Sequence, residues 1–268
     1  MKKIVLIVAL FIGVSACKVN PFTGQKTLNF YPNSQIFPTA FAQYDQFLGE
    51  NKVLTGTAEA HMITRTGQRI SAAAERWLTA NGYPGYLSDY KWEYNLVDNE
   101  AVNAWCMPGG KIVFYTGILP ITQTETGVAV VMGHEVAHAL ADHGAQRMSA
   151  GTLQQVGAVA GNVALKDEQR NVFNQVYGVG SQVLGMLPFS RGHETEADRI
   201  GLQIMAIAGY DPYEAAELWK RMKASSGGEA PPEFMSTHPS NDTRINNLTV
   251  WAPEAAAEAA KFGVTEFK

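Results

Sequence analysis

The chain has 268 residues, which is enough for one large domain or two small ones with a substantial buried core. Hydrophobic residues make up 46% of it and charged residues 17%, a composition typical of a globular protein and not of a disordered one. The formal net charge of −4 provides no basic surface for a polyanion, so we expect no nucleic acid partner.

The chain begins with the features of an export signal. Two lysines precede an apolar run, Ile4 to Val14, that is too short to span a bilayer as a permanent helix. The run leads into VSAC, which resembles the lipobox of bacterial lipoproteins. That resemblance implies a signal peptide over residues 1–16 and a lipid anchor on Cys17. Because Lys18 replaces the aspartate typical of inner-membrane retention, we expect a periplasmic protein held at the outer membrane. A plain secretory peptide with an incidental cysteine is the alternative.

The next elements follow from turn residues and hydrophobic spacing. Turn-forming residues dominate 17–36, which we interpret as an N-terminal tether. Apolar residues at helical intervals then predict helices over 36–48 and 57–80. Residues 89–98 alternate apolar and polar side chains, as a half-buried strand does. No linker composition divides residues 37–268, so we expect a single domain there.

The middle of the chain predicts a hairpin and then helices. NAWCMPGGKIVFYTGIL has two β-prone runs on either side of Pro-Gly-Gly, so with the preceding strand it predicts a sheet of about three or four strands. A helix begins at Thr122, which with Glu125 fits the Thr-x-x-Glu capping box. Further helical stretches cover 153–187, with a loop near Asp167, and 192–208. The expected fold class is α+β and mainly α-helical, with a small mixed sheet.

The helix from Thr122 contains the pentapeptide HEVAH, residues 134–138. Four residues span about 400° of a helix, so His134 and His138 share a face and can reach a single ion. Glu135 is rotated by about 100° from His134, where it can accept a proton from water on the metal. The pattern alone also occurs by chance on ordinary helices. Its place on a capped helix beside a hairpin favours a zinc site with its own base.

A catalytic zinc requires a third protein ligand and an open fourth position. The segment RGHETEADRIG offers Glu194 and Asp198, which are four residues apart on one helix face. Glu194 can bind the metal while Asp198 accepts the N–H of a ligand histidine. An isolated acidic run of this kind is more simply a solvated helix start. Beside the histidine pair, the ligand interpretation is favoured.

Four motifs in order, HEVAHALADHGAQR, SRGHETEADRIGL, AGYDP and STHPSNDTRI, resemble the HtpX and CAAX-prenyl-protease superfamily of zinc metallopeptidases. NPFTGQKTLNF and the hairpin segment resemble its lipid-anchored periplasmic branch, which includes BepA and LoiP. The resemblance implies a gluzincin-type fold with an active-site helix and one zinc ion per chain. It implies His134, His138 and Glu194 as ligands, Glu135 as general base and Asp198 as the support of a ligand histidine.

Other polar residues near these motifs are more ambiguous. His238 lies in STHPS, which the resemblance places near the metal, where it could stabilise an oxyanion or cap the metal at rest. A solvent-facing loop histidine is the alternative. Arg244 could orient His238 or Glu194, bind substrate, or form a structural ion pair. His193 should point away from the metal, and His143 should lie on the opposite helix face from His134.

The leading hypothesis is a zinc-dependent endopeptidase of the bacterial cell envelope, tethered to a membrane by its lipid. The resemblance implies polypeptide substrates, namely misfolded or misassembled envelope proteins. An exposed strand edge at Asn103 to Trp105, or at Ile112 to Tyr115, could hold an extended substrate by backbone hydrogen bonds. The alternative is a chaperone or assembly-factor module with a structural or plugged zinc site. A metal-storage lipoprotein is a third option.

Overall fold

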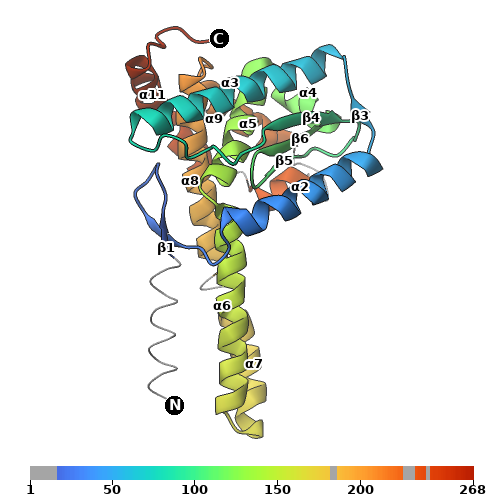
Figure 1. Ribbon diagram of the computed structural model, residues 1–268, viewed down its shortest axis with the longest axis vertical. Coiled ribbons are helices and arrows are strands. Elements are labelled where there is room, and N and C mark those ends of the chain that lie inside the picture. Colours follow the sequence, from blue (N-terminus) through green and yellow to red (C-terminus); the bar gives the residue numbers. More distant parts are fainter. Residues whose placement is uncertain (1–16, 182–185, 226–232, 240–241) are drawn as a thin grey trace.

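The computed structural model describes residues 17–181, 186–225, 233–239 and 242–268 (Figure 1). The signal peptide expected at the N-terminus lies outside these residues. The described part is mainly helical with a small mixed sheet, which confirms the expected fold class. None of its helices combines the length and the hydropathy that crossing a bilayer requires. The strands are β1 (Cys17–Val19), β2 (Lys26–Leu28), β3 (Val53–Leu54), β4 (Glu93–Val97), β5 (Ala104–Met107) and β6 (Lys111–Tyr115). The helices are α2 (Asn33–Glu50), α3 (Ala58–Ala80), α4 (Leu119–Thr122), α5 (Glu125–Leu140), α6 (His143–Ala164), α7 (Asp167–Ser181), α8 (Leu187–Ile207), α9 (Glu214–Ser225), α10 (Glu233–Thr237) and α11 (Asp242–Lys261).

The main sheet has four strands in the order β3-β4-β6-β5. The predicted hairpin forms β5 and β6, which pair antiparallel, whereas β4 and β6 pair parallel. Every residue of β6 is buried because helices cover both faces of this central strand. Ile112 and Phe114 pack into the large core with α3 and α5, whereas Val113 and Tyr115 pack with Tyr44 of α2 on the other face. The outer strand of the hairpin, β5, therefore forms one edge of the sheet.

Helix α5 carries HEVAH through the middle of the molecule. Every residue from Gly127 to Leu140 is buried, so this helix is packed on all sides. Its N-cap is Thr124, whose hydroxyl accepts a hydrogen bond from the backbone N–H of Gly127 at 3.0 Å. The predicted start at Thr122 is therefore wrong by three residues. Thr122 is the last residue of the short helix α4, so it cannot form a capping box with Glu125.

Helix α8 crosses α5 at a pair of glycines, and this crossing brings together the two motifs of the site. A Cβ atom on Gly201 would lie 2.7 Å from the backbone carbonyl carbon of Gly133, and one on Gly133 would lie 2.8 Å from the carbonyl oxygen of Gly201. Real Cβ atoms do not approach backbone this closely, so the contact requires glycine on both helices. The start predicted for this helix at residue 192 is also wrong, because α8 begins at Leu187 and includes Pro188 in its first turn, where proline is tolerated.

We expect Gly201→Ala to lower the free energy of unfolding by about 1–3 kcal/mol, because the new methyl group forces the two helix backbones apart. Gly192→Ala is the matched control, since a Cβ there meets nothing within 4 Å and lies on the same helix. The control should raise the free energy of unfolding by about 0.5–1 kcal/mol. Denaturant unfolding of the metal-free protein measures both. Equal effects of the two variants would contradict the close helix contact.

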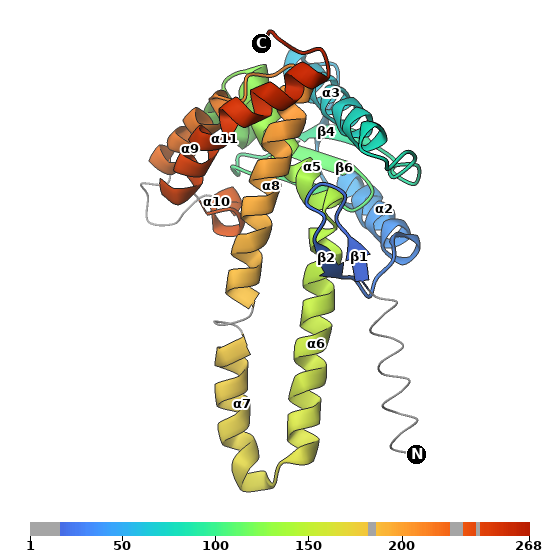
Figure 2. The same cartoon turned by 90° about the vertical axis from the view of Figure 1, so that its left-hand side faces the viewer.

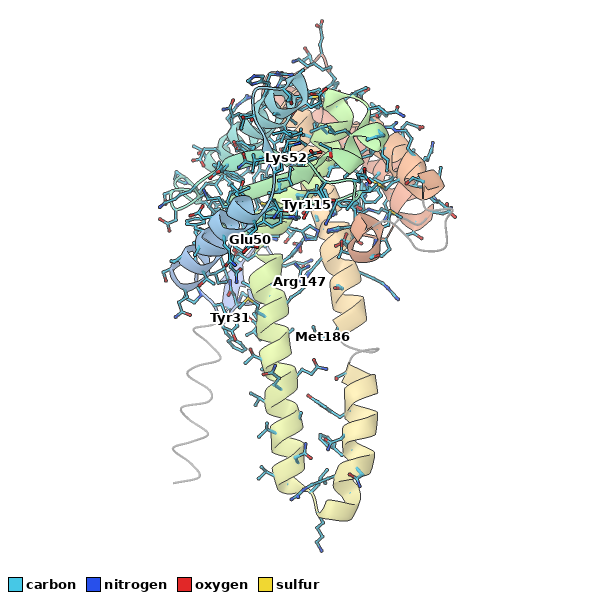
Figure 3. The ribbon with its side chains drawn as sticks, turned by 90° about the vertical axis from the view of Figure 1, so that its right-hand side faces the viewer. Tyr31, Glu50, Lys52, Tyr115, Arg147 and Met186 are labelled. Atoms are coloured by element: carbon cyan, nitrogen blue, oxygen red, sulfur yellow. The ribbon has the colours of Figure 1, made fainter. Side chains whose placement is uncertain are left out.

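Helices α6 and α7 form an antiparallel hairpin that projects from the body of the protein, with the described part of α8 completing its base (Figures 1, 2 and 3). The turn between them follows Ala164, close to the loop predicted near Asp167. No residue from Met148 to Leu165 is charged. The exposed large apolar residues on this part of α6 are Met148, Leu153, Val156, Val159 and Val163.

Candidate metal centre

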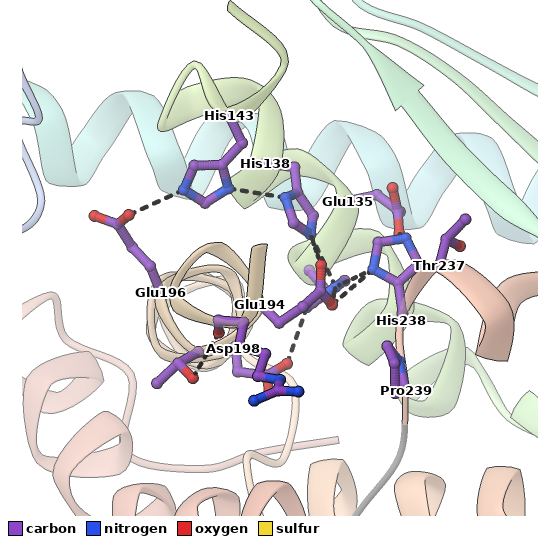
Figure 4. A network of polar contacts seen from close by, with 12 residues as sticks. Glu135, His138, His143, Glu194, Glu196, Asp198, Thr237, His238 and Pro239 are labelled. Carbon is purple, nitrogen blue, oxygen red and sulfur yellow. Dashed lines mark hydrogen bonds and ion pairs between the residues drawn. The ribbon is translucent and has the colours of Figure 1, made fainter. Parts of the chain in front are cut away.

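Four side chains from three parts of the chain converge at one place, and Figure 4 labels three of them, His138, Glu194 and His238. His134 and His138 come from α5, Glu194 from α8, and His238 from the residue that follows α10. Each offers one donor atom, and the four donors all lie within 4.8 Å of one another. Glu194, predicted as the third ligand, therefore lies beside the histidine pair although it is 56 residues beyond His138 in the sequence (194 − 138).

The separations between the donors suit a zinc ion. Nε2 of His134 lies 3.1 Å from Nε2 of His138 and 3.3 Å from Oε2 of Glu194, and Nε2 of His138 lies 3.3 Å from Oε1 of Glu194. Ligand atoms at about 2.0–2.2 Å from a tetrahedral zinc are about 3.3–3.5 Å from one another. Two imidazoles and a carboxylate are also donors that zinc prefers. The residues present therefore fit the metal.

Glu135 lies next to this group without joining it. Its side chain is buried, and its Oε1 atom accepts no hydrogen bond from the described residues. Nε2 of His238 lies 3.5 Å from this Oε1 atom, which is too long for a good hydrogen bond. Burial raises the pKa of Glu135 above its ordinary value, although His238 and His134 act in the opposite direction. A raised pKa suits a carboxylate that has to accept a proton at neutral pH.

The electrostatics of Glu194 differ from those of Glu135. Burial acts to raise the pKa of Glu194, but hydrogen bonds from His134, His138 and His238 outweigh it and hold the pKa well below the ordinary range. Glu194 is therefore ionised at any physiological pH, as a metal ligand has to be. Two glutamates of one site thus have pKa values shifted in opposite directions, which separates a ligand from a base.

Asp198 lies where the sequence predicted it, on the far side of His134. Its Oδ1 atom is 2.9 Å from Nδ1 of His134, so that nitrogen can donate to the carboxylate and leave Nε2 facing the donor group. Arg244 donates from Nη2 to the same oxygen at 2.6 Å, and its guanidinium lies over the ring of Trp219 at 3.4 Å. Arg244 is buried, and its contact with Asp198 has the form of a structural ion pair. Its Nη1 atom also lies 3.5 Å from Oε2 of Glu194, one of the two residues that it was expected to orient.

His238 is nearer to the donor group than an exposed loop histidine would be. Its Nδ1 atom lies 2.8 Å from Oε2 of Glu194 and 3.1 Å from Nε2 of His134. Its ring also packs on Phe234, with the centroids 4.7 Å apart. The separations from Glu194 and His134 are close to those between two ligands of one ion. With His238 as a further ligand, a metal at this centre could have four protein ligands and no open position.

The structure adds His143 and Glu196, which the sequence did not predict. His143 was expected on the face opposite His134 because α5 was taken to continue past it. The helix instead ends at Leu140, and Asp142 adopts left-handed backbone with φ of 55°, so α6 begins in a new direction at His143. Nδ1 of His143 consequently lies 2.8 Å from Nδ1 of His138, and its Nε2 lies 2.9 Å from Oε2 of Glu196.

His193 lies outside the metal group, as expected. Its Nε2 contacts Oε1 of Gln146 at 3.1 Å, and its ring stacks on His143 with centroids 4.1 Å apart. The only sequence signal for the added pair was a third histidine five residues after His138, followed by a glutamate two residues after Glu194. Neither spacing indicates a contact without the bend between α5 and α6.

Comparison with known proteins identifies the family. The sequence profile of peptidase family M48 matches residues 64–252, which is more than half of the chain. The mitochondrial metalloendopeptidase OMA1 of Schizosaccharomyces pombe is 38% identical over 188 residues, which cover 69% of this chain and 53% of that protein. Its human counterpart is 26% identical over 269 residues, which cover 92% and 50% of the two chains.

A bacterial relative is also found. The beta-barrel assembly-enhancing protease of Escherichia coli is 30% identical over 156 residues, which cover 56% of this chain and 32% of that protein. The chain spans about half the length, or less, of the curated relatives it matches. The profile includes both zinc motifs, from HEVAH to the glutamate of α8, and the geometry joins them at one centre able to hold a metal ion. The chain belongs to peptidase family M48, a family of zinc metallopeptidases.

Proposed function

We propose that this protein is a zinc-dependent endopeptidase. One observation carries the proposal: three donors, from His134, His138 and Glu194, lie at separations that suit zinc, and the buried carboxylate of Glu135 stands beside them. Zinc held there would lower the pKa of a water molecule and polarise the carbonyl of a peptide bond. Structural zinc sites are closed by four ligands, so His238 has to leave the donor group before a water molecule can bind the metal.

The side chains of this site then have separate tasks. Glu135 accepts the proton of the attacking water and passes it to the leaving amine. Asp198 orients the ring of His134 by accepting a hydrogen bond from the Nδ1–H of that ring, and Arg244 fixes Asp198 by donating to the same carboxylate oxygen. The low pKa of Glu194 keeps it anionic throughout.

The direct test uses an unfolded polypeptide of known sequence, incubated with the purified protein and analysed for fragments by mass spectrometry. Cleavage should stop when a chelator removes the metal and should return when zinc is restored. Cleavage that persists in the metal-free protein would refute a zinc peptidase. A zinc-loaded protein that binds the polypeptide without cleaving it would support the alternative, a chaperone or assembly-factor module.

His238 lies as close to His134 and Glu194 as another ligand of the same ion would. This position favours a role in covering the metal at rest over a role in stabilising an oxyanion. We therefore expect His238→Ala to raise the cleavage rate, by roughly 5–30-fold if displacing the cap costs 1–2 kcal/mol. Thr237→Ala is the control, since that hydroxyl donates to the carbonyl of Phe234 and does not face the donors. A fall in kcat for His238→Ala, with zinc retained, would assign His238 to the reaction itself.

We propose that substrates bind in extended form along β5. Strand β6 is excluded as a substrate edge because β4 and β5 pair with its two sides, which removes the candidate run Ile112 to Tyr115. The other candidate run lies at the sheet edge, and the N–H of Phe234 donates to the carbonyl of Val102 just before β5, which places α10 and His238 close to that edge. The N–H of Tyr115 donates to the carbonyl of Asn103, so by strand alternation Ala104 and Cys106 direct their backbone groups away from β6 and toward the free edge. Cys106→Pro, which removes one of these donors, should raise KM without changing zinc content.

The envelope setting is a separate proposal, supported by the lipobox-like sequence before Cys17 and by the bacterial relative. The part of α6 that begins at Met148 has an uncharged, apolar surface, which is compatible with a position near lipid or near unfolded envelope proteins. The relative that is 38% identical is mitochondrial, so misfolded or misassembled envelope proteins as substrates rest on the resemblance to the periplasmic branch. Expression of Cys17→Ser in a bacterium tests the anchor: the protein should move from the membrane fraction to the soluble fraction, and unchanged sedimentation would exclude lipidation at this residue.

A further inference from the structure

The second metal-facing histidine, His138, has its own chain of supporting contacts. Its Nε2 faces the donor group, so its Nδ1 has to point elsewhere, and it lies 2.8 Å from Nδ1 of His143 (Figure 4). Two ring nitrogens at this distance form a hydrogen bond only if one of them carries a proton and the other does not. Which of the two donates therefore decides whether Nε2 of His138 has a lone pair for a metal.

Glu196 settles the direction of that hydrogen bond. A carboxylate only accepts, so Nε2 of His143, 2.9 Å from Oε2 of Glu196, has to be the protonated nitrogen of the neutral ring. Nδ1 of His143 is then the acceptor, and Nδ1 of His138 is the donor. This leaves Nε2 of His138 unprotonated and aimed at the donor group. Asp198 fixes the tautomer of His134 by a direct contact with its Nδ1 atom, whereas Glu196 acts on His138 through one intervening residue, His143.

The outer end of this chain is held by the N-terminal segment. Nδ2 of Asn20 donates to Oε1 of Glu196 at 2.7 Å, and the hydroxyl of Thr23 donates to the same oxygen at 3.0 Å. Asn20 is 4% exposed, so its donor is not an incidental surface contact. The segment is also anchored independently, because Phe22 stacks on Trp77 with ring centroids 4.3 Å apart. Loss of a single donor should therefore leave the segment docked.

We propose that His143 and Glu196 are positioning residues for the metal site, and that the segment between β1 and β2 supports them through Asn20 and Thr23. They hold His138 in the tautomer whose Nε2 can bind zinc. The inference rests on the proposed role of His138 as a zinc ligand. It also gives the segment expected to be a tether a structural part in the site.

If these contacts had only a structural role, they would hold the segment on the body of the protein and their loss would not change the affinity for zinc. The two roles differ in zinc affinity, which can be measured by competition with a chromophoric chelator and does not depend on peptidase activity. We expect His143→Ala to weaken zinc binding by about 10–100-fold. His143→Asn should recover part of that loss, because its amide oxygen can accept from Nδ1 of His138 while the contact to Glu196 is lost.

Milder variants keep the test valid if His143→Ala fails to fold. Glu196→Gln preserves size and should weaken zinc binding by several-fold to about tenfold, at the lower end of the range for such supporting groups. Thr23→Val removes one donor to Glu196 and should cause a smaller loss. Thr27→Val is the matched control, because its hydroxyl lies on the adjoining strand β2 and donates to the carbonyl of Lys18. The control should leave zinc affinity unchanged.

The outcomes separate this inference from the proposed function. A wild-type protein that binds no zinc would overturn both. A wild-type protein that binds zinc, with affinity unchanged in Glu196→Gln and in a folded His143→Ala, would overturn the positioning role alone. Thermal unfolding of the metal-free variants should show similar stability for Thr23→Val and Thr27→Val, so that a difference in zinc affinity between them supports the chain of contacts. An equal effect of these two variants on zinc affinity would contradict a role for the segment.

Discussion

Replacing Glu135 with glutamine is expected to lower kcat for peptide cleavage by about 10²–10⁴-fold, the usual contribution of a general base. Glutamine has nearly the same size, but its amide cannot accept the proton of the attacking water. Because the carboxylate of Glu135 lies beside the donor group and not within it, the variant should keep its zinc. KM should change little, since the backbone of α5 and the edge of the sheet are unaltered.

The measurement is the steady-state rate on an unfolded polypeptide, with zinc content determined on the same sample. Glu125→Gln is the matched control, because it makes the same chemical change on the same helix, where Glu125 pairs with Arg65 at the surface end. The control should retain wild-type kcat. A Glu135→Gln protein that is zinc-loaded, folded and fully active would show that another group accepts the proton.

Replacing Glu194 with alanine is expected to reduce zinc affinity by more than the 10–100-fold loss that is typical of supporting residues, because a direct ligand is removed. Cleavage should fall to background at zinc concentrations that saturate the wild-type protein. The removal also takes away the anion that balances His134 and His138 in a buried site. Metal-free Glu194→Ala should nevertheless remain folded, since α8 is held by its apolar contacts with α5 and α11.

Zinc content after dialysis against a weak chelator measures this effect, and equilibrium titration with zinc gives the affinity. Thr195→Ala is the control on the same helix, because that exposed hydroxyl donates to the carbonyl of Arg191, one turn earlier. The control should hold zinc as tightly as the wild type. A Glu194→Ala protein with undiminished zinc affinity would remove this glutamate from the ligand set.

Much of the site could be predicted because helix geometry is local. The four-residue spacings of His134 with His138, and of Glu194 with Asp198, place each pair on one helix face whatever the rest of the fold does. The sequence also indicated that the two pairs meet, but only through the chemical need for a third ligand and through the family resemblance. The contact itself depends on the paired glycines of α5 and α8, whose role is not visible in a single sequence.

The parts that sequence reasoning missed depend on long-range contacts or on a bend without a signature. Neither Ala141 nor Asp142 is glycine or proline, the residues that most clearly mark a helix end, although Asp142 has a positive φ in the structure. The contact of His143 with His138 followed from that bend. The parallel pairing of β4 with β6 and the two-residue strand β3 could not be read from local patterns either, because alternation predicts a strand and not its partner.

The most direct measurement is anomalous diffraction at the zinc absorption edge from crystals of the zinc-loaded protein. The account predicts one strong anomalous peak per chain, at about 2.0–2.2 Å from Nε2 of His134, Nε2 of His138 and a carboxylate oxygen of Glu194. No peak at this centre in zinc-loaded crystals, or a single peak bound by other residues, would contradict it.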